Sequence, residues 1–172
     1  MLEEAGARVQ VVKKIDQLRR VQGLVIPGGE STALIKLMDA GDWWESLRAF
    51  AGAGNAMLGT CAGMILLARE VLNPPQKTLG LIDATVERNS YGRQRESFEG
   101  MGTFGSGRRE RPLAMVFIRA PRIRRLGPRV KALAFCRGDC VLARQDSILV
   151  ASFHPELTAD LTVHHYFLAM AG

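Results

Sequence analysis

Cys61 is the residue whose setting is best suited to nucleophilic chemistry. It stands at the centre of residues 59–63, GTCAG, between a predicted buried strand and a predicted apolar helix. Small residues two positions to either side are typical of a nucleophile elbow, a sharp strand-to-helix turn that exposes the reactive atom. The N-terminus of a helix favours a thiolate there, and the N–H of Ala62 is placed for a developing oxyanion. The alternative is a buried structural thiol, but strand, paired glycines and helix all favour the elbow.

His154 and Glu156 are candidates for the base and for the group that orients it. They belong to residues 152–156, SFHPE, which follow the last predicted strand. Two residues apart in an extended chain, their side chains project to the same side. Glu156 can then accept a hydrogen bond from one imidazole nitrogen, and the other can serve Cys61 as base and later as acid. Alone, the segment could be a surface turn; paired with an elbow cysteine, it favours catalysis.

A third motif, PGGES at residues 27–31, follows a predicted strand and opens a predicted helix. Gly28 and Gly29 would let backbone amides approach a ligand closely. The motif could also be only a tight turn, and it is not a phosphate loop because no Gly-Lys-Ser/Thr follows. Ligands of α/β sheets lie at the carboxyl ends of strands. We therefore expect this turn to converge with Cys61 and His154.

The elements that must position these residues alternate in the first half of the chain. Strands are predicted at 8–12, 23–27 and 55–59, and helices at 16–20, 31–40, 43–51 and 62–72. The near-continuous apolar character of 23–27 predicts burial on both faces, and Ser31 or Thr32 is expected to cap the helix after it. This alternation predicts a three-layer, flavodoxin-like α/β fold, with a mostly parallel central sheet and helices on both faces.

The second half changes character. Strands are predicted at 79–87, 114–118, 130–135, 141–144 and 148–152, before a closing helix at 158–170. His164 and His165 lie in that helix without an acidic partner at useful spacing and are expected on its faces. Residues 100–111, rich in Gly, Ser and Arg, are expected to form an exposed, mobile loop. Residues 1–172 are expected to form one domain.

Composition narrows the class of protein. The chain has 172 residues, 47% hydrophobic and 23% charged, with a formal net charge of +6. No apolar run is long enough for a membrane span and the first residues do not form a signal peptide, so a cytoplasmic protein that does not enter membranes is expected. The basic residues lack interleaved aromatics, which favours a solvated face or a surface for an acidic protein partner over nucleic acid. Cys136 and Cys140 lack metal-site spacing and are expected to be ordinary thiols flanking a turn, so no metal is predicted.

Five segments spread over nearly the whole chain carry a family resemblance. They are PGGEST (27–32), GTCAGMILLA (59–68), VERNSYGRQRESFEG (86–100), VFIRAP (116–121) and SFHPELT (152–158). With these the chain resembles the class I, triad-type glutamine amidotransferases, and among them the glutaminase subunits of pyridoxal 5′-phosphate synthase. Other triad amidotransferases share the elbow and the His-x-Glu motif but not the remaining segments.

The resemblance implies a reaction without a cofactor. Cys61, His154 and Glu156 would form a catalytic triad that hydrolyses L-glutamine to glutamate and ammonia through a thioester. The oxyanion hole would be formed by the amides of Gly29 and Ala62. The ammonia would pass to a (β/α)8-barrel synthase subunit that makes pyridoxal 5′-phosphate, or vitamin B6. The residues implied to hold L-glutamine are Gly28, Gly29, Glu30, Arg88, Ile118 and Arg119.

One departure concerns the start of the chain. Family members begin with a strand and a helix, whereas residues 2–6 of this chain match the end of that helix, so the first strand of the sheet is expected to be missing. Two alternatives therefore stay open. One is a catalytically impaired subunit that only binds the synthase. The other is a different triad-type amidotransferase or a cysteine hydrolase on the same fold.

Overall fold

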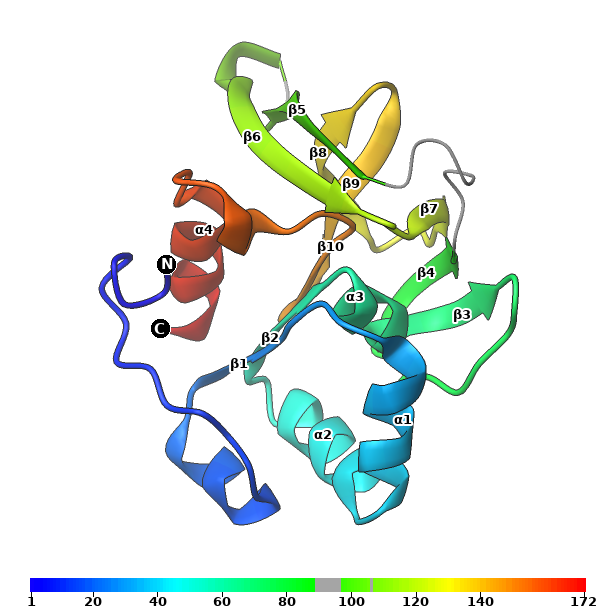
Figure 1. The fold of residues 1–172 in the computed structure, drawn as a ribbon. Helices are drawn as coiled ribbons and strands as arrows, with labels where there is room; N and C mark the ends of the chain where they lie inside the picture. Colours follow the sequence, from blue (N-terminus) through cyan, green and yellow to red (C-terminus); the bar gives the residue numbers. More distant parts are fainter. Residues whose placement is uncertain (89–96, 106) are drawn as a thin grey trace.

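The computed structural model describes residues 1–88, 97–105 and 107–172, which form two β-sheets with helices packed around them (Figure 1). The larger sheet has seven strands in the order β1-β2-β10-β9-β8-β5-β6, and the smaller has the order β3-β4-β7. The larger sheet comprises β1 (Gly23–Ile26), β2 (Ala56–Thr60), β10 (Ile148–Ala151), β9 (Asp139–Gln145), β8 (Lys131–Cys136), β5 (Ser97–Phe104) and β6 (Arg111–Ile118). The smaller comprises β3 (Ala68–Leu72), β4 (Ile82–Glu87) and β7 (Arg122–Leu126).

The larger sheet divides into a parallel part and an antiparallel part. β1, β2 and β10 are parallel, with β2 between the other two. From β10 onward each strand pairs antiparallel with the next, β9, β8, β5 and β6 in turn. The α/β class is confirmed, but the parallel part holds three strands rather than most of the sheet. Hairpins such as that between β8 and β9 need only a short turn, whereas parallel strands need a crossover.

Helices cover both faces of the larger sheet, which confirms the three layers. The α-helices of the described residues are α1 (Ser31–Asp39), α2 (Trp43–Gly52), α3 (Ala62–Leu67) and α4 (Thr162–Ala171). Three short 3-10 helices accompany them: η1 (Ile15–Arg20), η2 (Gly107–Arg109) and η3 (Pro155–Leu157). α1, α2 and α3 share one buried cluster with Met57 of β2. α4 packs on the opposite face, where Val163 and Phe167 join Leu58 of the same strand. Successive residues of β2 thus face opposite layers, as strand geometry requires.

Two predicted elements differ in type from those observed. The helix expected over 62–72 ends at Leu67, and the next five residues form β3. Beyond Leu67 the backbone pairs in parallel with β4 rather than with the preceding turn. Of the loop expected over 100–111, residues 100–104 belong to β5, which pairs with β6 along its full length, and residues 107–109 form η2. Gly102 is there for packing, since a Cβ would lie 2.5 Å from both the Met115 side chain and the Phe135 carbonyl oxygen.

The N-terminal segment joins neither sheet. Residues 8–12, expected as a strand, run without strand pairing, although Val12 packs against a buried cluster. β1 is the last strand of its sheet, so among the described residues its outer edge has no strand partner. Only Ile26 of β1 is buried, which corrects the expectation that this strand is covered on both faces.

Both chain ends lie beside α4 (Figure 1). Of the segment with the most specific family resemblance, residues 89–96 lie outside the described residues. Within the described parts of the chain, no helix is both long enough and apolar enough to cross a membrane.

Candidate active site

The three predicted motifs meet at the carboxyl ends of the parallel strands in the larger sheet. Gly28 follows β1, Cys61 follows β2, and His154 lies just beyond β10. The register pairs Ile26 with Gly59, and Ala151 with Thr60, so the three strands end at the same level. Because they are parallel and adjacent, their carboxyl ends bring the three loops together. The convergence expected from the sequence is confirmed.

Cys61 has the backbone of a nucleophile elbow. Its φ of 50° and ψ of −105° lie outside the regions that non-glycine residues normally adopt, and α3 begins at the next residue. A Cβ at Gly59 would lie 2.5 Å from the carbonyl carbon of Gly63, and a Cβ at Gly63 would overlap the carbonyl oxygen of Ile26. The two glycines therefore allow α3 to pack directly on the strands, and this packing holds the strained turn in place.

Cys61, His154 and Glu156 lie together in one cluster. The Cys61 side chain interacts with the His154 ring, and Nδ1 of His154 lies 2.8 Å from Oε1 of Glu156. The interaction with Cys61 and then the hydrogen bond to Glu156 raise the pKa of His154 to about 9, against the opposing effect of burial. Burial pushes the pKa of Glu156 upward, but the hydrogen bond from His154, the residue's own backbone N–H and the nearby histidine charges together outweigh burial and hold that pKa below its usual value. The cluster therefore favours a protonated His154 beside an ionised Glu156.

The segment that carries His154 is tied to the antiparallel part of the sheet. The His154 N–H donates to the carbonyl oxygen of Val116 in β6 at 2.8 Å. Phe153, fully buried, packs near Phe117 of the same strand with ring centroids 5.8 Å apart. The backbone after His154 is not extended as expected, because η3 begins at Pro155. The predicted contact between His154 and Glu156 nevertheless forms, across a 3-10 turn.

The glycine turn after β1 lies against this cluster. A Cβ at Gly28 would overlap the His154 ring and lie 3.3 Å from Cβ of Cys61, so only glycine fits here. Gly29 has open space around it but a φ of 144°, which a side chain would strain. Glu30 is the N-cap of α1 and accepts from the Thr32 N–H at 3.3 Å. The cap is thus Glu30 rather than the expected Ser31 or Thr32.

The remaining residues expected to hold a ligand approach from two sides. The Ile118 carbonyl oxygen, at the end of β6, lies 3.8 Å from Sγ of Cys61. Arg119 follows it, exposed and with a φ of 44°. Arg88 donates to Oε1 of Gln76 at 2.8 Å, and Oε1 also accepts from Ser31 at the start of α1. Arg88 is thereby linked to the glycine turn through Gln76.

Three side chains near the site were not singled out from the sequence. Gln76 bridges Arg88 and Ser31, and its buried Nε2 has no hydrogen-bond partner among the described residues. His164 was expected on a helix face but is 4% exposed, and it lines a cavity of about 310 Å³ that also reaches Glu156. Thr60 contributes to the same cavity. Of these three residues, only Thr60 could have been found from the sequence, because it belongs to the elbow motif.

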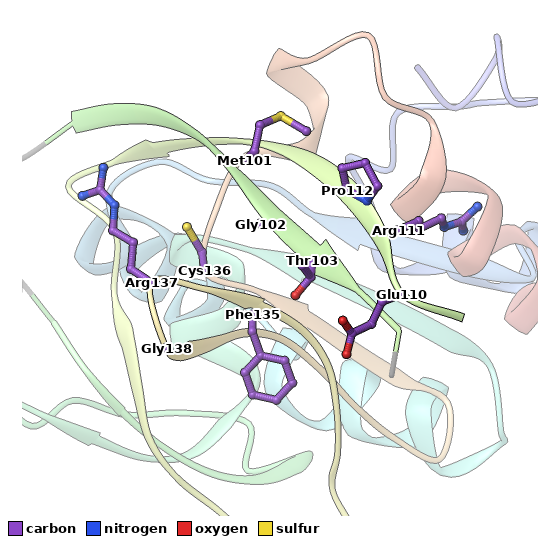
Figure 2. Close-up of a pocket in the computed structure, with 10 residues that line it drawn as sticks. All are labelled: Met101, Gly102, Thr103, Glu110, Arg111, Pro112, Phe135, Cys136, Arg137 and Gly138. Carbon is purple, nitrogen blue, oxygen red and sulfur yellow. The ribbon is translucent and has the colours of Figure 1, made fainter. Parts of the chain in front are cut away.

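A larger cavity, of about 500 Å³, lies away from the cluster. Figure 2 shows its lining, which comes from β5, β6 and the β8–β9 hairpin, with Met101, Phe135 and Arg137 among the labelled side chains. Cys136 lies in this lining, and Cys140 follows the turn, as expected of two thiols on a hairpin. All three cysteines are free, and burial raises the pKa of Cys136 and raises that of Cys140 to about 11.

A free cysteine at a strand-to-helix elbow, beside a histidine that is hydrogen-bonded to a carboxylate, gives this three-layer α/β fold the features of a cysteine-dependent hydrolase. Comparison with known proteins defines the class further. The model of the SNO glutamine amidotransferase family matches residues 1–171, and the chain belongs to this family. The resemblance inferred from the sequence is therefore confirmed, and the chain is a glutamine amidotransferase.

The similar proteins agree with this membership. A "Pyridoxal 5'-phosphate synthase subunit PdxT" of Thermosipho africanus is 49% identical over 170 residues, 99% of this chain and 89% of the relative. A protein of the same name from Geobacillus sp. is 50% identical over 98% of this chain and 87% of its own length. A crystal structure described as a glutamine amidotransferase has a TM-score of 0.91 at 43% identity, covering 99% of this chain and 90% of the other. A second glutamine amidotransferase structure, from Thermotoga maritima, shares the fold, with a TM-score of 0.60 at 15% identity over 93% of this chain and 66% of the other.

Proposed function

We propose that this protein hydrolyses L-glutamine to glutamate and ammonia with Cys61 as nucleophile, His154 as acid and base, and Glu156 as the orienting carboxylate. The observation that carries the proposal is the strained elbow at Cys61 beside His154, whose Nδ1 lies 2.8 Å from the Glu156 carboxylate. The raised pKa of His154 supports its proposed role, because it keeps a proton available for a leaving group.

The reaction proceeds in two halves. The Cys61 thiolate attacks the side-chain amide carbon, and the amides of Gly29 and Ala62 stabilise the resulting oxyanion. The C–N bond breaks as His154 gives its proton to the departing ammonia, which leaves a thioester. Water, deprotonated by His154, then attacks the thioester and releases glutamate and the thiolate. No metal or cofactor takes part in these steps.

The glutamine site lies between the glycine turn and the end of β6. The backbone of Gly28 approaches His154 and Cys61, Gly29 follows it in the same turn, and the Ile118 carbonyl oxygen lies 3.8 Å from Sγ of Cys61. Arg119 and Arg88 are the cations suited to the amino-acid carboxylate. Glu30, at the start of α1, is suited to the amino group.

The ammonia is proposed to pass to a (β/α)8-barrel synthase subunit that makes pyridoxal 5′-phosphate in the cytoplasm. The support is the pair of relatives near 50% identity, both named as subunits of that synthase. Residues 1–172 act as one glutaminase domain in this assembly. Docking of the synthase subunit is proposed to activate hydrolysis.

The test is glutamate release from L-glutamine, measured with and without the synthase subunit, for the wild type, Cys61→Ala and Cys136→Ala. Cys136 is the matched control because it is also buried and free but lies far along the sheet. We expect wild-type activity that rises with the synthase subunit, loss in Cys61→Ala and retention in Cys136→Ala. Activity that survives Cys61→Ala would overturn the assignment.

A second candidate is a subunit that binds the synthase without hydrolysing glutamine. The observation that favours it is the outer edge of β1, which has no strand partner among the described residues and lies next to the turn that carries Gly28. It predicts binding of the synthase subunit with no glutamate release in either condition. The same assay, combined with a measurement of complex formation, separates the two candidates.

A further inference from the structure

Thr60 is the residue next to Cys61, and its hydroxyl lies at the junction of three loops. It ends β2 and is 1% exposed. Its Oγ1 accepts from the N–H of Gly28 at 3.1 Å and lies 3.5 Å from Oε1 of Glu156. A threonine hydroxyl has one proton to donate and can accept as well. Because the Gly28 amide supplies a donor, the hydroxyl proton is free for the Glu156 carboxylate.

The same carboxylate oxygen of Glu156 thus receives two donors. Nδ1 of His154 is 2.8 Å from Oε1, and the Thr60 hydroxyl approaches that atom from β2. Within the described part of the chain, His154 and Thr60 are the two side chains that hydrogen-bond to Glu156. The Glu156 side chain is about one-third exposed and follows a proline in a three-residue helix. It therefore depends on few contacts to stay oriented toward His154.

Gly28 connects this arrangement to the glycine turn. Its Cα packs against the His154 ring and Cβ of Cys61, so a shift of the turn would move both. Its N–H is fixed by the Thr60 hydroxyl. One hydroxyl thereby joins the turn after β1, the end of β2 and the helix after β10.

We propose that Thr60 is a positioning residue, whose hydroxyl holds the Glu156 carboxylate against His154 and fixes the Gly28–Gly29 turn beside Cys61. This inference rests on the proposed glutaminase function and assigns a role that Cys61, His154 and Glu156 do not cover. The effect of Thr60 on the reaction passes through Glu156 and Gly28.

The variants that test this role are Thr60→Val, which keeps the shape and removes the hydroxyl, and Thr60→Ser, which keeps the hydroxyl. Thr85→Val is the matched control. Thr85 is also buried in a strand, donates to Glu70 at 2.8 Å and accepts from Arg125 at 3.4 Å, but it lies in the smaller sheet. All variants are assayed with the synthase subunit present, and thermal melting establishes that each is folded.

We expect Thr60→Val to lower kcat by about tenfold to a hundredfold, as loss of a hydrogen bond to a charged group does. KM should rise by a smaller factor than kcat falls, because the contact with Glu156 acts on the chemical step, whereas the contact with Gly28 steadies a turn proposed to bind glutamine. Thr60→Ser should restore kcat to within about threefold of the wild type, and Thr85→Val should leave it unchanged. If Thr60→Val is unfolded at the assay temperature, Thr60→Ala takes its place.

A double-mutant cycle with Glu156→Gln separates positioning from a general loss of packing. If Thr60 acts through Glu156, Thr60→Val should lower kcat much less in the Glu156→Gln background than in the wild type. Full additivity of the two changes, a wild-type kcat in Thr60→Val, or an effect on KM alone would overturn the inference. Absence of glutaminase activity in the wild type would instead overturn the proposed function, so the two failures are distinguishable.

Discussion

The parallel and antiparallel parts of the larger sheet place their loops in opposite ways. β1, β2 and β10 run in one direction, so the loops after them meet at one edge and assemble Gly28, Cys61 and His154. β8, β9, β5 and β6 alternate in direction, so their connections divide between two edges. The larger cavity lies in the antiparallel part, whereas the reactive cluster lies at the carboxyl ends of the parallel strands. Strand direction locates the chemistry of this molecule better than cavity size does.

The largest expected effect in this comparison comes from adding one carbon at the elbow. Gly63→Ala places a Cβ against the Ile26 carbonyl oxygen, which forces α3 away from β1 and displaces Cys61. We expect unfolding to become easier by about 1–3 kcal/mol and glutaminase activity to fall by a factor on the order of a hundred or more. Chemical denaturation and glutamate release measure the two effects.

The control for Gly63→Ala is Gly138→Ala in the β8–β9 turn. Gly138 has a φ of 85° with open space around it, so the added Cβ strains the backbone without striking a neighbour. We expect a loss of about 1 kcal/mol in stability and unchanged activity. If Gly138→Ala lowers activity as much as Gly63→Ala does, the contrast between the two parts of the sheet is wrong.

The next effect concerns pH and the Glu156 carboxylate. Wild-type kcat/KM should fall as pH rises through about 9, because His154 then loses the proton that it gives to ammonia. In Glu156→Gln a neutral amide replaces the anion that stabilises the imidazolium, so the pKa of His154 decreases and the alkaline fall should begin at lower pH. We also expect kcat to decrease by about a hundredfold, since the imidazole loses its orienting partner. Initial rates measured from about neutral to alkaline pH give both results.

Asp139→Asn provides the counterpart in the antiparallel part. Asp139 accepts two hydrogen bonds from Arg122, at 2.8 and 2.6 Å. Weakening this partly exposed pair should cost about 1 kcal/mol or less and leave the pH profile unchanged. An alkaline fall that shifts in Asp139→Asn but not in Glu156→Gln would contradict the role given to Glu156.

A smaller contrast is expected between the cysteines. Near neutral pH, Cys136 and Cys140 are protonated because burial raises the pKa of each thiol. Cys61 has an imidazolium beside it and lies at the start of α3. Iodoacetamide should therefore label Cys61 at least about tenfold faster than the other two, as read by peptide mass spectrometry. Equal labelling of all three cysteines would show that the elbow does not activate the thiol.

The smallest effect is expected in the larger cavity. Met101 is 64% exposed, and Met101→Gln exchanges an exposed apolar side chain for a polar one of similar length. Stability should change by less than about 0.5 kcal/mol, and glutaminase activity measured without the synthase subunit should be unaffected. A clear loss of that activity would show that the antiparallel part communicates with the cluster, against the division drawn above.

The sequence predicted the reactive edge well because its signals are local. Strand ends marked by glycine or proline and a small-residue pattern around Cys61 are readable within a few positions, and the structure brings these residues together. The contact between His154 and Glu156 was predicted for the same reason, although the backbone between them is a 3-10 turn. Site features that depend on distant packing were missed, such as Gln76 between Arg88 and Ser31.

The errors in the fold have a shared cause in nonlocal pairing. Residues 68–72 contain no glycine or proline and were predicted to continue the helix, but β4 offers backbone partners that the local pattern does not reveal. Residues 100–104 contain glycines and were predicted as loop. In the structure they belong to β5, where Gly102 leaves room for the neighbouring residues Met115 and Phe135. Residues 8–12 have the composition of a strand, but no described strand pairs with them. A segment with strand propensity forms a strand only where another strand can pair with it, and the rest of the fold decides which strands lie alongside.

The direct contact between Gly63 and the end of β1 has a consequence for how this site can vary. The sulfur is positioned by backbone atoms meeting backbone atoms, at Gly59 against Gly63 and at Gly63 against Ile26. Apolar side chains of α3 can therefore be exchanged for others of similar volume, by drift or by design, without relocating Cys61. Positions 59 and 63 offer no such freedom, so a library built on this scaffold should hold them fixed, together with Gly28, Thr60 and the reactive cluster.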